Sequence, residues 1–453
     1  MSLRTYAFTA IAFALLSGAS VEARQQRSQP TREHAREHAD GELASLRLER
    51  NPLAPVYVVM SRRSYNGMRD LMQQPVAKSD SAGTPLVLAQ IRAHQLSRVS
   101  ERIHANEGRC GGYFAFATRA EAEAFLRSDR SLQAMKSLPV RVEYTLDNAA
   151  TVDPWLSQVQ HTNIYNTIAH LSAYQNRYYA SNEGRVAAEW IRNTWQALAG
   201  NRTDVTSELF ACSTCATQPS VILTIRGTDS PDEIVVLGAH LDSINGSAGG
   251  SVLQRAPGAD DDASGIATLT EVLRVAMASG WKPRRTVKFM GYAAEEVGLR
   301  GSNAIAQAHK LSGANVVAVL QMDMTNYKTS TNIDMRLVSD YSNAELKLFL
   351  TRLFDTYLAP RGMNRGTDFC GYACSDHASW TSAGYPSGFF FEAGTGASSG
   401  GAFPQIHTAN DTLANMANSA QNSAKFAQLG LAFLGEAAKT ASSKTAPVAG
   451  SDD

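Results

Sequence analysis

The chain has 453 residues, of which 44% are hydrophobic, and its 42 Lys and Arg residues balance its 42 Asp and Glu residues. This length and apolar content suffice for a large core divided between two or three folding units. The charge is uneven, with 19 basic against 14 acidic residues in 24–147, but that part of the sequence has no dense basic stripe with interleaved aromatic residues. Nucleic-acid binding is therefore not expected.

The first residues have the pattern of an export signal. Arg4 precedes a largely apolar stretch from Ala7 to Leu16, and the triplet ending in Ala23 suits cleavage after that residue. The apolar stretch is too short to span a bilayer in the mature protein. We expect residues 1–23 to be a signal peptide and the mature protein to be secreted, with no membrane association after signal removal. A periplasmic location and a short retained anchor are the alternatives.

Residues 24–147 are predicted to hold a polar lead-in, 25–51, followed by a small α+β unit from about residue 55 to 147. Apolar runs predict strands at 56–60, 113–118 and 140–146, and helices at 86–103 and 119–127. Residues 148–153 are interpreted as a linker.

Beyond residue 154 the sequence alternates between strand and helix patterns. This alternation predicts an α/β fold with a mixed, mostly parallel central sheet between helices, and sites beyond the carboxyl ends of its strands. We expect this unit to cover 148–440 and a flexible tail to follow at 441–453. The predicted strands are 234–241, 287–292, 316–322 and 387–392, and the predicted helices are 164–171, 185–198, 266–278, 302–310, 344–358 and 424–437.

Five cysteines suit an oxidising compartment. Cys370 and Cys374 are separated by three residues, and Cys212 and Cys215 by two, so that each pair can form a local disulfide. A zinc site made of these four cysteines is the alternative. Cys110 is left over, and its state stays open.

Candidate chemical groups recur where predicted strands end. Glu295 and Glu296 close an apolar run, and adjacent side chains on an extended chain point to opposite sides. One carboxylate can therefore face a metal while the other faces a substrate. Two residues apart, His240 and Asp242 share one side of their chain, so that Asp242 can hold the second ring nitrogen of a metal-bound His240.

Further acidic groups and a histidine complete the set. Three carboxylates at 260–262 precede a predicted helix, Asp323 ends an apolar strand, and His407 lies in a turn-rich loop. Taken one at a time, part of the acidic triplet can be explained as a helix cap, and His407 as a loop residue with no ligand role. Together, two histidines and several carboxylates suit a pair of zinc ions that share a water.

Six segments carry a resemblance to a known family, namely GAHLDS, PGADDDASGIA, YAAEEVGLRGS, QMDMTNY, CGYACSDHASW and IHTANDTLAN. In this order, over about residues 151–438, the chain resembles the secreted bacterial leucyl aminopeptidases, which are co-catalytic zinc exopeptidases. The resemblance implies two zinc ions per chain and a cis peptide bond between Asp261 and Asp262. One ion would be held by His240, Asp261 and Asp323, and the other by Asp261, Glu296 and His407.

The resemblance also implies the catalytic roles. Glu295 would be the general base, Asp242 would position His240, and Tyr372 would donate to the oxyanion. The substrate would be a peptide with a free amino terminus and an apolar, Leu-type first residue, and the enzyme is expected to be a monomer. The residues implied to line the substrate pocket are Met324, Tyr372, Phe391 and Ile406. A Gly-rich loop at 393–403 leaves the exact side-chain preference open.

The unit before residue 148 is then interpreted as a propeptide, whose excess of basic residues would favour docking over an acidic cleft. Three alternatives share the predicted fold. They are a glutaminyl cyclase-like enzyme with a single zinc ion, a non-catalytic binding protein, and a carboxypeptidase.

Overall fold

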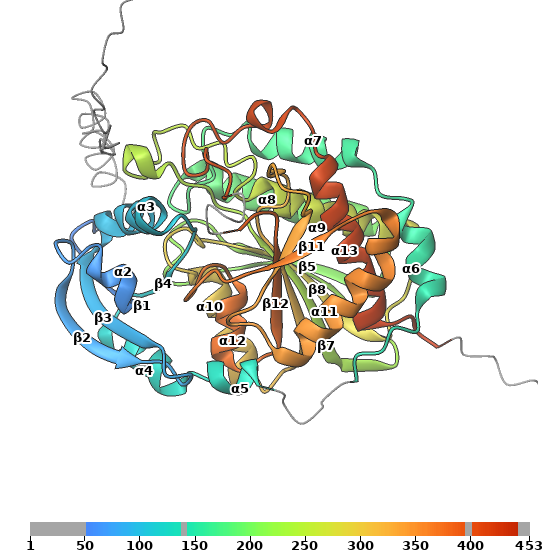
Figure 1. The fold of residues 1–453 in the computed structure, drawn as a ribbon, viewed down its shortest axis with the longest axis horizontal. Helices are drawn as coiled ribbons and strands as arrows, with labels where there is room; N and C mark the ends of the chain where they lie inside the picture. Colours follow the sequence, from blue (N-terminus) through green and yellow to red (C-terminus); the bar gives the residue numbers. More distant parts are fainter. Residues whose placement is uncertain (1–50, 137–142, 395–400, 443–453) are drawn as a thin grey trace, which may run out of the picture.

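The structure is a computed structural model that describes residues 51–136, 143–394 and 401–442. It contains two β-sheets. A small amino-terminal unit, residues 51–136, packs against one side of a much larger α/β unit (Figure 1). Among the described residues, no helix combines the length and the hydropathy that a bilayer crossing needs.

The amino-terminal unit is an antiparallel sheet in the order β2-β3-β1-β4, with helices beside it. Its apolar side chains alternate between two clusters, and both clusters include residues of the larger unit. The strands are β1 (Pro55–Ser61), β2 (Gln73–Ser79), β3 (Pro85–Arg92) and β4 (Tyr113–Phe116), and the helices are α2 (Arg62–Asn66), α3 (Leu96–Glu107), α4 (Arg119–Ser128) and α5 (Ser131–Met135).

Three predictions for this part of the chain are wrong. The helix predicted at 86–103 is strand β3 followed by helix α3, because a short apolar run that is buried between two strands looks the same in sequence as a buried helix segment. Of the strand predicted at 140–146, residues 140–142 lie outside the described residues and 143–146 form no strand. The expected linker at 148–153 is instead the start of helix α6 (Ala149–Leu156), which buries Val152 and Trp155.

The larger unit has an eight-stranded mixed sheet in the order β11-β10-β12-β9-β7-β8-β6-β5. Its four central strands, β12, β9, β7 and β8, run parallel to one another, as the sequence predicted. The strands are β5 (Val205–Phe210), β6 (Ser220–Ile225), β7 (Ser230–His240), β8 (Arg285–Tyr292), β9 (Asn315–Met322), β10 (Met335–Val338), β11 (Arg365–Asp368) and β12 (Ser387–Phe391).

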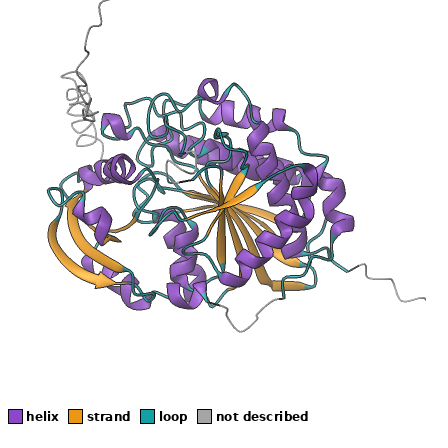
Figure 2. Ribbon diagram, viewed as in Figure 1, coloured by secondary structure: helices purple, strands orange, loops and turns teal. Residues whose placement is uncertain are grey.

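Helices cover both faces of this sheet (Figure 2). On one face, alternate side chains such as Val235 and Leu237 of β7 pack with α6, α7, α8, α9, α11 and α13. On the other face, Val236 of β7 packs with Ile305 of α10 and Trp380 of α12. The remaining helices are α7 (His161–Leu171), α8 (Asn182–Ala199), α9 (Ala263–Ala278), α10 (Arg300–Leu311), α11 (Ala344–Tyr357), α12 (His377–Ala383) and α13 (Gln421–Ala438).

Candidate metal centre and active site

The carboxyl ends of the central parallel strands carry the predicted site residues to one edge of the sheet. His240 is the last residue of β7, Asp323 directly follows β9, and Glu295 and Glu296 lie in the loop that follows β8. Because β7 is hydrogen-bonded to both β8 and β9, these side chains converge. All four are at most 2% exposed, so the site is buried.

Asp261 lies at the centre of the cluster, between two histidines. His240 Nε2 is 2.9 Å from Asp261 Oδ1, and His407 Nε2 is 3.0 Å from Asp261 Oδ2. Each carboxylate oxygen therefore faces a different imidazole. A carboxylate in this position can contribute one oxygen to each of two metal ions. The peptide bond between Asp261 and Asp262 is cis, as the resemblance implied.

Each half of the cluster has one further carboxylate. Asp323 Oδ1 lies 3.5 Å from His240 Nε2, and Glu296 Oε2 lies 2.9 Å from His407 Nε2. Neither of these oxygens has a hydrogen-bond partner among the described residues, even though both are buried. Close approach without hydrogen-bond geometry is the arrangement expected of ligands that surround a cation. The set of two imidazoles and three carboxylates fits zinc.

The electrostatics of the cluster also favour cations. Burial would lower the pKa of His240, but Asp323, Asp242 and Asp261 raise it well above its ordinary value. Burial raises the pKa of Glu296 to about 7, and the Asp261 charge adds to this rise. Buried carboxylates at this separation repel one another unless positive charge lies between them, and two divalent ions would supply that charge.

Asp261 is also held from behind, by a residue that sequence reasoning missed. Asp411 accepts hydrogen bonds from the backbone N–H groups of Asp260 and Asp261, at 2.8 and 3.1 Å. Ser375 Oγ similarly donates to Asp323 Oδ2 at 2.6 Å. In the sequence, Asp411 is simply the acidic residue of a turn-rich loop, and nothing in that loop indicates which backbone groups it would bind.

The acidic triplet divides its functions. Asp262 caps helix α9 by accepting from the Gly265 N–H, and it also accepts from the N–H groups of His240 and Met324. Asp260 accepts from the N–H group of Asn326 on the loop after β9. The helix-cap interpretation therefore holds for Asp262, and Asp261 is the one of the three whose carboxylate faces the imidazole rings of His240 and His407.

Asp242 contacts its predicted partner, His240, and also the segment that carries Glu295 and Glu296. Its Oδ1 lies 3.4 Å from His240 Nδ1, and its two oxygens accept from the N–H groups of Glu295 and Glu296 at 3.0 and 3.2 Å. Asp242 thus fixes the two-glutamate segment as well as the imidazole. Neither carboxylate oxygen of Glu295 has a hydrogen-bond partner among the described residues, and burial raises the pKa of Glu295 well above its ordinary value.

The predicted pocket residues are only partly brought together. Met324 and Phe391 line a cavity of about 20 Å³ beside the cluster, together with Phe389. Ile406 is buried in the main core and is not part of that lining. The Tyr372 ring lies against Phe114 of the amino-terminal unit, with ring centroids 5.9 Å apart, so its oxyanion role stays a prediction.

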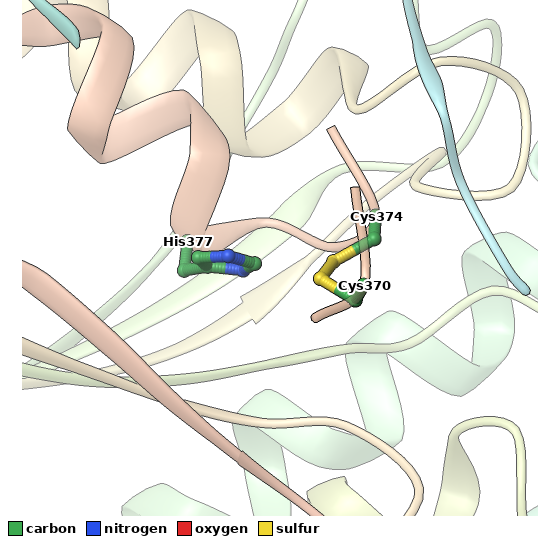
Figure 3. A group of neighbouring side chains, drawn as sticks. All are labelled: Cys370, Cys374 and His377. Carbon is green, nitrogen blue, oxygen red and sulfur yellow. A yellow bond between two sulfur atoms is a disulfide. The ribbon is translucent and has the colours of Figure 1, made fainter. Parts of the chain in front are cut away.

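Both predicted disulfides are formed, Cys212–Cys215 and Cys370–Cys374, and the alternative of a four-cysteine zinc site is wrong. His377 lies next to the second disulfide (Figure 3). These three side chains have the spacing of a metal site, but the disulfide occupies both sulfurs. The His377 ring instead packs on Phe389, with centroids 5.2 Å apart.

Comparisons with known proteins identify the family of the chain. Residues 220–432 match peptidase family M28. A probable leucine aminopeptidase of Arthroderma otae is 36% identical over 272 residues, which make up 59% of this chain and 71% of that relative. Leucine aminopeptidase 1 of Sclerotinia sclerotiorum is 34% identical, over 62% of this chain and 73% of its own length. These relatives are fungal, so the bacterial, secreted group inferred from the sequence stays a prediction.

Solved structures extend the likeness beyond the catalytic unit. LapB of Legionella pneumophila is 28% identical with a TM-score of 0.71, and the match covers 85% of this chain and 99% of LapB. The LapA aminopeptidase of the same organism is 26% identical with a TM-score of 0.69, over 85% of this chain and 98% of LapA. The fold, the converging donors and these relatives lead to one assignment. The chain belongs to peptidase family M28 and is a metallo-aminopeptidase.

Proposed function

We propose that the chain binds two zinc ions and removes apolar, leucine-type residues from the amino terminus of peptides. The observation that carries this proposal is the position of Asp261, whose two oxygens face His240 and His407 separately. One ion would lie between His240, Asp261 and Asp323, and the other between Asp261, Glu296 and His407. When bound, two such ions activate a water molecule and polarise the scissile carbonyl.

The residues around the ions have separate functions. Glu295 takes a proton from the attacking water and passes it to the leaving amine. Its carboxylate is available for this role, because neither oxygen is hydrogen-bonded to the described residues. A raised pKa suits this role, since the carboxyl group must hold the proton between the two transfers. Asp242 positions the base through the Glu295 N–H and orients His240.

The preference for an apolar first residue is supported by the cavity beside the ions. Its walls include Met324, Phe389 and Phe391, and its exposed lining is nearly all apolar. The relatives described above are named leucine aminopeptidases. Tyr372 would complete the site as the oxyanion donor, once its ring is free of Phe114.

The amino-terminal unit acts as a propeptide in this proposal, removed by cleavage near residue 148 after export of the chain. Its supporting observation is position, because Gly108, Arg109 and Cys110 line the same cavity as Met324 and Phe391. The enzyme would then act as a secreted monomer on peptides with a free amino terminus.

A Glu295→Gln variant tests the catalytic assignment. Glutamine keeps the shape of the side chain but cannot accept a proton, so we expect turnover of a leucyl anilide to fall at least about 100-fold. Two zinc ions per chain should remain, as measured by elemental analysis. The control is Glu189→Gln, which alters only a half-exposed pair with Arg185 on α8 and should leave the rate unchanged.

The same assays separate the alternatives. A glutaminyl cyclase-like enzyme would bind one zinc ion and act on an amino-terminal glutamine, and a binding protein would hydrolyse neither substrate. An enzyme that cleaves an amino-terminally blocked analogue as fast as the free peptide would contradict the aminopeptidase proposal. Full turnover by Glu295→Gln would remove its role as the base.

A further inference from the structure

Cys110 is the free cysteine of the described residues, and it reaches the metal centre from the amino-terminal unit. Its Sγ lies 3.4 Å from Asp261 Oδ2, on the side of Asp261 that faces His407. Ligand atoms of Cys110, Asp261 and His407 all lie within 4.8 Å of one another, close enough to hold one ion. A tetrahedral zinc ion with bonds of about 2.3 Å to sulfur and 2.0–2.2 Å to oxygen separates those two ligand atoms by about 3.5 Å.

A second, independent feature indicates a ligand at the same place. The Glu296 carboxylate is 2% exposed, and neither of its oxygens accepts a hydrogen bond from the described residues. Its Oε2 lies 2.9 Å from His407 Nε2. Asp261 and Glu296 both approach His407 Nε2, and the Cys110 sulfur lies beside Asp261 on that same side. A divalent cation bound there would satisfy the unpartnered carboxylate and find the sulfur within reach.

The loop that carries Cys110 is shaped to enter the site. Gly111 and Gly112 have positive φ angles of 56° and 102°, and a Cβ atom on Gly111 would lie 2.6 Å from the carbonyl oxygen of Ala373. The Gly112 N–H donates to that carbonyl oxygen. Arg109 donates to the Tyr372 carbonyl oxygen at 3.0 Å and is held by Glu107 at 3.0 Å.

The same loop excludes substrate. The cavity that remains beside Met324 and Phe391 measures about 20 Å³, which is room for a single water molecule. Helix α3 adds a second obstruction, because the rings of His104 and His407 lie 5.1 Å apart between centroids. A cavity of this size is too small for a leucine side chain while residues 108–110 line it.

We propose that Cys110 is a metal ligand of the uncleaved chain and that its bond to the metal keeps the uncleaved enzyme inactive. Its sulfur bonds the ion held by Asp261, Glu296 and His407, in the place that a reacting water needs. The S–H bond breaks, the sulfur–metal bond forms and the proton leaves to solvent, so that no oxidant or reductant is required. Cleavage between the two units would let the loop leave with the amino-terminal unit and open the site.

This inference rests on the proposed metal centre, and its test is spectroscopic. The uncleaved chain is loaded with zinc and studied by zinc K-edge X-ray absorption, where we expect a sulfur ligand at about 2.3 Å. The cobalt-loaded chain should show thiolate-to-cobalt charge-transfer absorption in the near ultraviolet. Both signals should vanish in Cys110→Ser and persist in the Cys212→Ser/Cys215→Ser variant, which removes the sulfurs of a disulfide that is not part of the site.

The possible outcomes separate this inference from the proposed function. If two ions bind but have only nitrogen and oxygen ligands, Cys110 is not a metal ligand, and the proposed metal centre still stands. Failure of the uncleaved chain to bind metal would overturn both. Because the sulfur signal is measured on the unaltered chain, the test holds even if Cys110→Ser does not fold. In a folded Cys110→Ser chain, competition with a chelator should show at least tenfold weaker binding of one ion.

Discussion

At the scale of single residues, Asp261 is fixed by its backbone as much as by its ligands. The backbone N–H groups of Asp260 and Asp261 both donate hydrogen bonds to the Asp411 carboxylate, while the Asp261 carboxylate faces two histidines. Asp411 therefore sets the direction of a side chain that it does not touch directly. Supports of this kind commonly change metal affinity by one or two orders of magnitude.

An Asp411→Ala variant would expose this dependence. Two buried backbone N–H groups would lose their acceptor, and we expect the free energy of unfolding to fall by about 2–5 kcal/mol. Zinc affinity should fall at least tenfold. Urea denaturation and metal titration measure the two effects. The control, Asp355→Ala, breaks an exposed pair with Arg365 and should cost at most about 1 kcal/mol.

The sequence predicted the positions of candidate ligands best where they end a strand, and their binding of metal stays a prediction. His240 and Asp323 stand at the ends of apolar strands, where an ionisable group needs a reason to be buried. His407 lies in a loop with no such signal; it was a candidate only as part of the whole donor set, and the resemblance implied its place in that set. Asp411 and Ser375 could not be predicted, because their partners are backbone and side-chain groups that the chain brings near only when folded.

At the scale of elements, the loop from Glu295 to Leu299 joins the active site to the amino-terminal unit. Gly298 has a φ of 105°, and its carbonyl oxygen accepts from the N–H of Ala115, which belongs to β4. A Cβ atom on Gly298 would lie 2.6 Å from the Cβ of Ala115. The same loop thus carries Glu295 and Glu296 at one end and the contact with β4 at the other.

A Gly298→Ala variant is expected to destabilise the uncleaved chain by about 2–4 kcal/mol, from the added clash and the strained φ together. Gly313→Ala is a matched control, because Gly313 also has a positive φ, of 68°, but no atom lies within 4 Å of an added Cβ. It should cost only about 1–2 kcal/mol. Thermal unfolding of both variants measures the difference, and equal losses would mean that the Ala115 contact is unimportant.

Element prediction was accurate for the parallel strands and poor in the amino-terminal unit. Strands β7, β8 and β9 are nearly continuous apolar runs between helices, and such a pattern has few other interpretations. Strand β2 is almost fully exposed, so its polar sequence gave no strand signal. Strand β3 was mistaken for a helix, since only its neighbours β1 and β2 distinguish the two.

At the scale of the whole molecule, the two units share their apolar cores. Phe114 is fully buried, with its ring 4.5 Å from that of Phe125 and 5.9 Å from that of Tyr372. Val59 and Leu88 join the same cluster as Leu299 and Ala373 of the larger unit. The described contacts that seat the amino-terminal unit thus combine this apolar packing with side-chain hydrogen bonds, such as those of Thr84 to Tyr341 and of Asn343 to the Ala134 carbonyl oxygen. We therefore expect the overall excess of basic residues noted in the sequence to contribute little to this packing.

The latency of the uncleaved chain should therefore resist salt. At 1 M salt the Debye length is about 3 Å, so interactions between exposed charges are screened, whereas apolar contacts stay intact. With a leucyl anilide as substrate, we compare the activity of the uncleaved chain with that of the cleaved chain. We expect the ratio of the two activities to change less than about twofold between about 0.05 and 1 M sodium chloride. Phe114→Ala, which removes a buried ring from the shared core, should raise uncleaved activity at both salt concentrations. If salt alone released the activity and Phe114→Ala did not, charge complementarity would be what holds the amino-terminal unit against the larger unit.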